Sequence, residues 1–334
     1  MESAVSSQGA LNALESSFNG RTPVRVHFLD NTSKVFLVDK DSTARSLLKS
    51  VLGKIGITAS PDQPRHQHLE DFFGLYESLD GGKIDSPLEP GTLVAARLKT
   101  WNSEAAKLVF MIRLSVESLW GLEDRDKVAK RLDKGNAPES LDLEQYLANA
   151  GVRDQSMIHL QYIQAMYNVI TSQYTTTEEQ ALKLGALHFQ FVFGAFSAAV
   201  HKEGFLGSRI VEFVPIKLLR VYDFDEWESR LYHTMSTSGA SAASGRAHDK
   251  AFQLRYLLMV VRLPEFGSAF YKCTQTGARA LPETVFLGVQ HDVSLSPVVF
   301  DYVQPTNSNR HPHPHHSGHQ TIQQEPKAAH VAAR

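Results

Sequence analysis

The stretch from Ile158 to Phe196 constrains the fold of this 334-residue chain more than any other. In its first half, apolar side chains recur at three- and four-residue spacing, which places them on one face of a helix. These side chains are Ile158, Tyr162, Ile163, Met166, Tyr167 and Ile170. The helix is expected to end near Ser172. A second helix is expected after Thr177, because Thr177 and Gln180 stand at the spacing of a capping box. The two helices form a hairpin that must be buried against further helices.

The same stretch resembles part of a known family. An LQYIQA helix, a polar turn of the form T-x-E-E-x-A and a GALHFQFVFG helix follow one another in the order found in the central helical lobe of a FERM domain. Taken alone, this pattern also suits an ordinary buried helical hairpin. The order of the flanking segments favours the FERM interpretation.

The segments before the hairpin resemble the first, ubiquitin-like lobe of a FERM domain. Strands are expected from Val24 to Val38, with a turn at Asp30 and Asn31. Asp41 and Ser42 are expected to cap a helix that Gly56 ends. Further strands are expected at 72–77 and 107–113. The local structure of the intervening GTLVAARLKTW segment is left open.

The segments after the hairpin complete the resemblance. An amphipathic helix is expected over 223–235 with Trp227 facing inward, and a last helix is expected to end at Pro264. The sequence PEFGSAFYKC resembles the junction with the third lobe, which in this family is a PH- or PTB-like sandwich. Strands are expected at 269–274, 284–290 and 294–302, too few to close such a sandwich. The family's peptide groove is therefore not transferred to this chain.

The resemblance implies an α+β fold with a ubiquitin-like β-grasp lobe, a helical bundle lobe and an incomplete PH/PTB-like lobe. We expect a disordered leader at 1–20, the ubiquitin-like lobe at 21–113 and the helical lobe at 114–265, with a charged insertion at 115–150. The partial third lobe is expected at 266–303. A disordered His-rich tail is expected at 304–334.

Composition excludes several classes of protein. The 34 basic residues nearly balance the 36 acidic ones, which argues against a nucleic-acid binder with one dominating basic field. The single cysteine, Cys273, excludes an internal disulfide and favours a reducing compartment. The chain shows neither a secretion signal nor a membrane-spanning stretch, so we expect a cytosolic protein.

Catalytic and cofactor signatures are missing from the sequence. It contains no G-x-S-x-G, Gly-rich phosphate loop or H-E-x-x-H motif. Cys273 lies within an expected strand and is interpreted as a structural thiol. His159 is interpreted as a satisfied or surface histidine, and the acidic residues at 223–226 favour the helix dipole at a helix start. We expect a non-enzymatic protein without a cofactor.

The family resemblance implies an adaptor at the cytoplasmic face of the membrane. Its expected partners are phosphoinositides, cytoplasmic tails of membrane proteins, and cytoskeletal or sorting proteins, with no nucleic acid among them. By position, the candidate lipid-binding residues are Arg45, Lys49, Lys54 and Lys272. Clustered cations attract anionic headgroups, although the same residues also suit a plain solvated surface.

The tail contains a run of histidines that suits a transition metal by side-chain chemistry. The candidate ligands are His311, His313, His315, His316 and His319. The prolines among them and the lack of a folded frame favour a low-complexity tail instead.

Two alternative functions stay open. The chain is a lipid-independent protein scaffold if its binding to partners does not change with salt concentration. It is a fragment of a larger FERM protein of the talin, myosin-tail or sorting-nexin type if further strands and a helix follow DYVQP.

Overall fold

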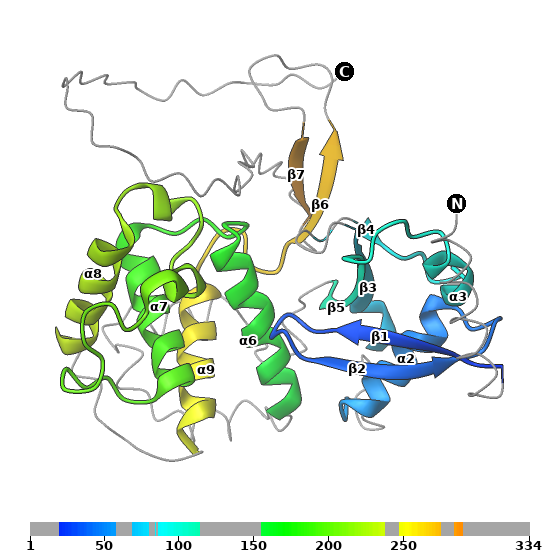
Figure 1. Cartoon of the computed structure of the whole chain (residues 1–334), viewed down its shortest axis with the longest axis horizontal. Coiled ribbons are helices and arrows are strands. Elements are labelled where there is room, and N and C mark those ends of the chain that lie inside the picture. Colours follow the sequence, from blue (N-terminus) through cyan, green and yellow to red (C-terminus); the bar gives the residue numbers. More distant parts are fainter. Residues whose placement is uncertain are drawn as a thin grey trace, which may run out of the picture. The chain divides into compact units, whose positions relative to one another are not determined.

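The first part of the chain forms a mixed sheet with a helix against one face (Figure 1). The computed structural model describes residues 20–57, 69–79, 84, 86–113, 155–237, 247–274 and 284–289. Among them, five strands pair in the order β2-β1-β5-β3-β4, with β1 and β5 parallel. The strands are β1 (Thr22–His27), β2 (Ser33–Val38), β3 (Phe73–Ser78), β4 (Ser86–Pro87) and β5 (Lys107–Ile112). The expected first hairpin and the strands near 72 and 107 are confirmed.

Helix α2 (Ala44–Lys54) covers the sheet with its apolar stripe, which includes the fully buried Val51. Its N-cap is Thr43, whose hydroxyl accepts a hydrogen bond from the Ser46 N–H at 3.2 Å. The prediction of an Asp41-Ser42 cap was therefore wrong by one residue. The Ser42 hydroxyl instead accepts a bond from the Asp39 N–H and closes the turn before the helix.

The segment left open by the sequence forms the short helix α3 (Val94–Leu98). Glu77 of β3 holds it, because this buried carboxylate accepts two hydrogen bonds of 2.8 Å from Arg97 and one of 2.7 Å from the Trp101 indole. A buried carboxylate requires such partners. The pairing spans twenty or more residues, which explains why local sequence patterns did not reveal it.

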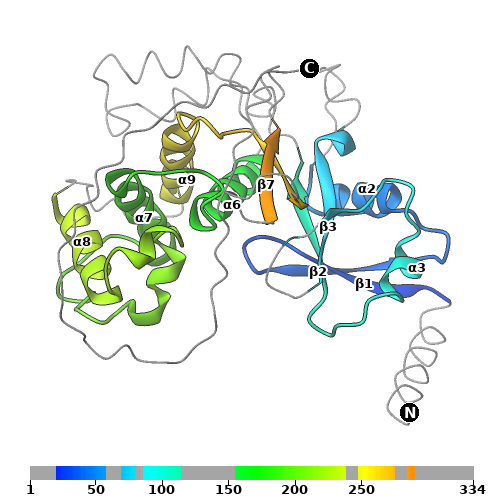
Figure 2. The ribbon, with the colours of Figure 1, turned by 90° about the horizontal axis from the view of Figure 1, so that it is seen from above.

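Among the described residues, four helices follow the sheet, and α6 and α7 form the predicted hairpin (Figure 2). They are α6 (Gln155–Ile170), α7 (Glu178–Phe193), α8 (Phe224–Thr237) and α9 (Ala247–Val260), with short 3-10 turns η5 (Gly207–Glu212) and η6 (Leu218–Arg220) between α7 and α8. Both bonds of the capping box between Thr177 and Gln180 are present. Helix α9 packs against α6 and α7, and α8 packs against α7. Trp227 is fully buried on α8, as predicted.

The last described element is an antiparallel pair, β6 (Ala269–Thr274) and β7 (Thr284–Val289). The strand expected at 294–302 lies outside the described residues. Tyr174, in the turn between α6 and α7, anchors the start of the pair. Its hydroxyl accepts a bond from the Gly267 N–H, and its ring lies 6.0 Å from that of Phe270.

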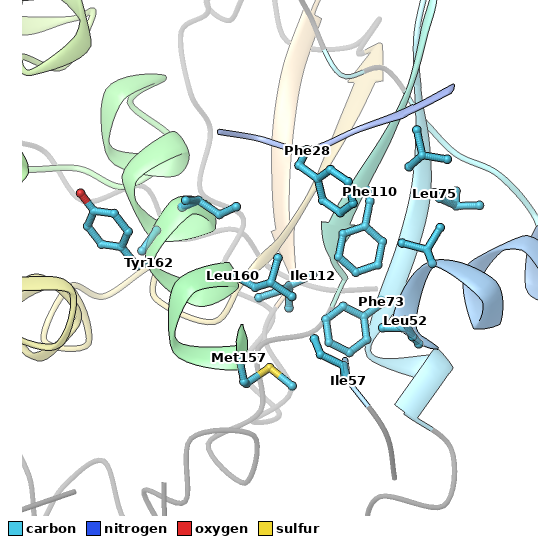
Figure 3. Packing of buried hydrophobic residues seen from close by; sticks show 14 of the residues in the cluster. Phe28, Leu52, Ile57, Phe73, Leu75, Phe110, Ile112, Met157, Leu160 and Tyr162 are labelled. Carbon is cyan, nitrogen blue, oxygen red and sulfur yellow. The ribbon is translucent and has the colours of Figure 1, made fainter. Parts of the chain in front are cut away.

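The sheet shares one hydrophobic cluster with α6, α7 and α9, whereas α8 packs in a second cluster with α7 and η5. Figure 3 shows Leu160 of α6 beside Ile112 at the end of β5, and Met157 of α6 directed toward Ile57. Strand β1 ends at His27, opposite Val109, so it does not reach the N–H of Ile112. That N–H instead donates to Gln164 Oε1 of α6 at 3.1 Å. We call this contact region between β5 and α6 the seam.

A second polar contact supports the seam. His159 Nε2 of α6 lies 3.5 Å from Asp30 Oδ2 in the β1–β2 turn, and His159 Nδ1 lies 2.9 Å from the Gln253 side-chain nitrogen of α9. His159 is therefore a satisfied histidine, as expected. Burial alone would raise the pKa of Asp30, but hydrogen bonds from His159 and Thr32 outweigh burial and lower this pKa to about 2.

We predict that Gly185→Ala destabilises the helical part of the chain. A Cβ at Gly185 of α7 would lie 2.7 Å from the Phe213 carbonyl oxygen and 3.3 Å from Leu231. We expect a loss of about 1–3 kcal/mol in the free energy of unfolding, measured in urea by circular dichroism. The control is Gly53→Ala in α2, where a Cβ meets nothing within 4 Å; it should be neutral or stabilise by up to about 1 kcal/mol. Equal stability of the two variants would contradict the close packing at Gly185.

The Asp30 contact predicts a small acid-dependent loss of stability. Because the folded pKa lies below the ordinary value of 3.8, the stabilisation is present above that value and is lost as pH falls toward about 2. Asp30 is partly exposed, so we expect at most about 1 kcal/mol after allowance for solvent screening. In urea titrations between pH 5 and pH 2, the free energy of unfolding should fall less with decreasing pH for Asp30→Asn than for wild type. Parallel profiles would refute this role of Asp30.

Candidate anion-binding surfaces

The structure places three of the four candidate cations, Arg45, Lys49 and Lys54, on α2, but it gives each of them a local partner. Arg45 lies 3.6 Å from Glu70 and 3.3 Å from Asp71, in the 3-10 turn η2 (Leu69–Asp71). Lys49 lies 3.2 Å from the same Glu70 carboxylate. Arg45 and Lys49 thus share a helix face, as predicted, and that face also includes two acids.

Glu70 is well suited to hold both cations, since its side chain is only 13% exposed. Burial raises its pKa, but its own backbone N–H, Lys49 and Arg45 outweigh burial and hold the pKa below its usual value. Glu70 is therefore ionised at neutral pH, and it neutralises part of the positive charge that a headgroup would meet.

Lys54 and Lys272 lie apart from this pair. The Lys54 ammonium donates to the Val35 carbonyl oxygen at 3.3 Å and lies 5.0 Å from the centre of the Phe36 ring. Lys272 belongs to β6, opposite Phe286 of β7. The five candidate histidines of the tail lie outside the described residues.

The remaining titratable side chains that stand out have structural explanations. His188 Nδ1 lies 2.6 Å from the Tyr162 hydroxyl, and burial, the largest cause, lowers the pKa of His188 to about 4. This imidazole is thus neutral within the core at neutral pH. Cys273 is half-buried, with its Sγ 3.6 Å from the Tyr271 carbonyl oxygen. Asp223 accepts a bond from the Glu226 N–H at the start of α8, as expected of an acidic helix start.

The described part of the chain offers no cluster of three or more metal-binding side chains. None of its helices has the length and apolar character needed to cross a bilayer.

Sequence reasoning missed two further cations, Arg25 and Lys107, which lie beside His27 on the face of the sheet opposite α2. Arg25 and His27 of β1 and Lys107 of β5 lie close enough together that Lys107 and Arg25 lower the pKa of His27, after the larger effect of burial. His27 and Lys107 are 80 positions apart in the sequence. Only the parallel pairing of β1 with β5 brings them together.

Comparison with known proteins places this fold in a family. The model of the FERM central domain matches residues 149–271, which include α6 to α9, and an RA-like domain model matches residues 20–115, which include the five-stranded sheet. Residues 149–271 thus match the central domain of the FERM family.

Relatives and solved structures agree with this assignment. FERM domain-containing protein C of Dictyostelium discoideum is 24% identical over 73% of this chain and 13% of its own length. Mouse Talin-2 is 25% identical over 75% of this chain and 10% of its own length. The chain therefore spans only a small part of the curated relatives that it matches.

The similar structures show the same FERM fold. The Dictyostelium Myosin VII MyTH4-FERM MF2 domain has a TM-score of 0.57 at 15% identity, covering 84% of this chain and 48% of that one. A second similar structure is the human Myosin 7b C-terminal MyTH4-FERM domain in complex with the harmonin-a PDZ3 domain. It has a TM-score of 0.52 at 16% identity, and the match covers 84% of this chain and 50% of that one.

We predict that the acids of η2 weaken any binding of anions to α2. The double variant Glu70→Gln/Asp71→Asn frees Arg45 and Lys49, and each freed cation is worth up to about 1 kcal/mol at an anionic membrane. Affinity for phosphoinositide vesicles should rise at least about threefold in co-sedimentation. The control Glu179→Gln/Glu203→Gln makes the same charge change at exposed positions of the helical lobe and should have little effect. An equal rise in both variants would show that net charge alone acts.

Proposed function

We propose that this FERM-family chain is a non-enzymatic adaptor at the cytoplasmic face of the membrane. It binds phosphoinositides and cytoplasmic tails of membrane proteins, and it links them to the cytoskeleton or to sorting proteins. The observation that supports this most directly is the order of a ubiquitin-like sheet and a helical lobe sharing one core, together with the talin and myosin relatives. Such a scaffold presents surfaces rather than a reaction centre.

The proposed localisation is peripheral membrane or cytoskeleton-associated. The myosin 7b structure shows that a FERM-containing tail accepts a protein partner, a PDZ domain in that case. By analogy, we propose that protein partners of this chain dock on its folded lobes.

The proposed lipid site on the ubiquitin-like lobe comprises Arg45, Lys49 and Lys54, with Lys272 at the start of the third lobe. The three α2 residues occupy exposed positions of one helix, which suits contact with a surface. Binding there requires the headgroup to compete with Glu70 and Asp71, so moderate affinity is expected.

We predict that reversing these charges abolishes phosphoinositide-dependent binding. The triple variant Arg45→Glu/Lys49→Glu/Lys54→Glu should lower vesicle affinity at least about tenfold, since three cations near an anionic leaflet each contribute about 1 kcal/mol. Co-sedimentation with and without phosphoinositide, at low and physiological salt, measures this effect. A variant with Lys183, Lys202 and Arg220 changed to Glu is the matched control on the helical lobe, where all three are exposed.

The pairing of Arg45 and Lys49 with acids favours one alternative function, a protein scaffold without lipid affinity. Under that alternative, wild-type protein does not sediment with vesicles at either salt concentration. Binding of a protein partner would also be insensitive to ionic strength. Such results would replace the lipid-guided adaptor with the scaffold.

A further inference from the structure

The alternation of side chains along each strand shows which residues lie on the face of the five-stranded sheet opposite α2. Val24 and Val26 of β1 are buried, so the intervening Arg25 and the following His27 belong to the opposite face. The register pairs Val26 with Leu108, which places Lys107 of β5 beside Arg25. Arg25, His27 and Lys107 therefore occupy neighbouring positions on two adjacent strands.

In the part of the chain that the structure describes, no acidic side chain compensates the charges of Arg25 and Lys107. Arg25 donates to the Ser33 hydroxyl at 3.2 Å. Among the described residues, neither Arg25 nor Lys107 has a carboxylate within ion-pair distance. The pKa of His27 supports this, because burial lowers it most, Lys107 and Arg25 lower it further, and no carboxylate contributes. Like charges on adjacent strands destabilise a sheet. On α2, by contrast, Glu70 and Asp71 pair with Arg45 and Lys49.

Two exposed apolar side chains flank the cations on the same face. Val35 pairs with Arg25 and Leu37 pairs with Pro23, and they are 43% and 46% exposed. Both belong to β2, an edge strand of the described sheet. Val35 and Leu37 do not pack in the described core, because Phe36 and Val38 form the buried face of this strand.

We propose that this outer-face patch, made of Arg25, His27, Lys107, Val35 and Leu37, is a second membrane contact, which binds the phosphate headgroup of an anionic lipid. Arg25 and Lys107 bind the phosphate, and Val35 and Leu37 enter the boundary between headgroups and acyl chains. This rests on the proposed membrane function. A lipid is favoured over a soluble phosphate because a soluble anion would use the cations alone, whereas a bilayer also buries adjacent apolar side chains.

The test compares variants on vesicles that contain a phosphoinositide. Arg25→Gln/Lys107→Gln should weaken vesicle binding about tenfold or more. The control Lys183→Gln/Lys202→Gln removes the same charge from exposed positions of the helical lobe and should cost less than about threefold. Circular dichroism confirms that each variant is folded.

A second pair of measurements separates the membrane from a free phosphate. Val35→Ser/Leu37→Ser should weaken vesicle binding at least about threefold. The same variant should bind soluble inositol trisphosphate as wild type does in calorimetry. Equal loss on both ligands, or no loss on vesicles, would overturn the role given to the apolar pair.

The outcomes distinguish this inference from the proposed function. If vesicle binding is unaffected by Arg25→Gln/Lys107→Gln but lost in Arg45→Glu/Lys49→Glu/Lys54→Glu, the outer-face patch is refuted and the membrane adaptor stands. If the two double variants lose affinity equally, the binding follows net charge and the patch is likewise refuted. If wild-type protein binds no vesicles, the membrane function fails and the inference fails with it.

Discussion

The seam between β5 and α6 is the interaction on which the rest of the described structure depends. A buried backbone N–H without a partner costs about 1–3 kcal/mol, and β1 is too short to pair with the N–H of Ile112. Gln164 supplies the missing acceptor, and its own side-chain nitrogen donates to Asn168 Oδ1 at 3.2 Å. Asn168 in turn accepts, through its carbonyl oxygen, the N–H groups of Gln173 and Tyr174 that shape the turn before α7. One chain of polar contacts thus runs from the sheet into the helical hairpin.

Because both lobes contribute to one core, their surfaces are presented by a common scaffold. On that scaffold, the positive charges fall into two kinds. Arg45 and Lys49 of α2 are held by Glu70 and Asp71, which lowers their attraction for an external anion. Those beside β1 lack such acids in the described residues, and the exposed Val35 and Leu37 adjoin them. Compensation by neighbours, rather than the number of lysines and arginines, determines which surface attracts an anion.

The sequence predicted features that depend on local order. The capping box at Thr177, the strand at Ala269–Thr274 and the inward Trp227 were all confirmed. The features it did not reveal depend on contacts between distant residues. Glu70 meets Arg45 across an intervening segment, and Lys107 meets His27 only through the register of β1 with β5. The outer-face patch therefore required the sheet order, which no helical or strand periodicity contains.

Native-state hydrogen exchange tests the seam as the link between the lobes most directly. In rising urea, amides of β5, including Ile112, and amides of α6 should exchange through one opening with a common free energy. Gln164→Leu should lower that free energy for both elements together, since it leaves the Ile112 N–H unpaired. If the sheet opened at a lower urea concentration than α6, and Gln164→Leu changed only one of them, the seam would not couple the two lobes.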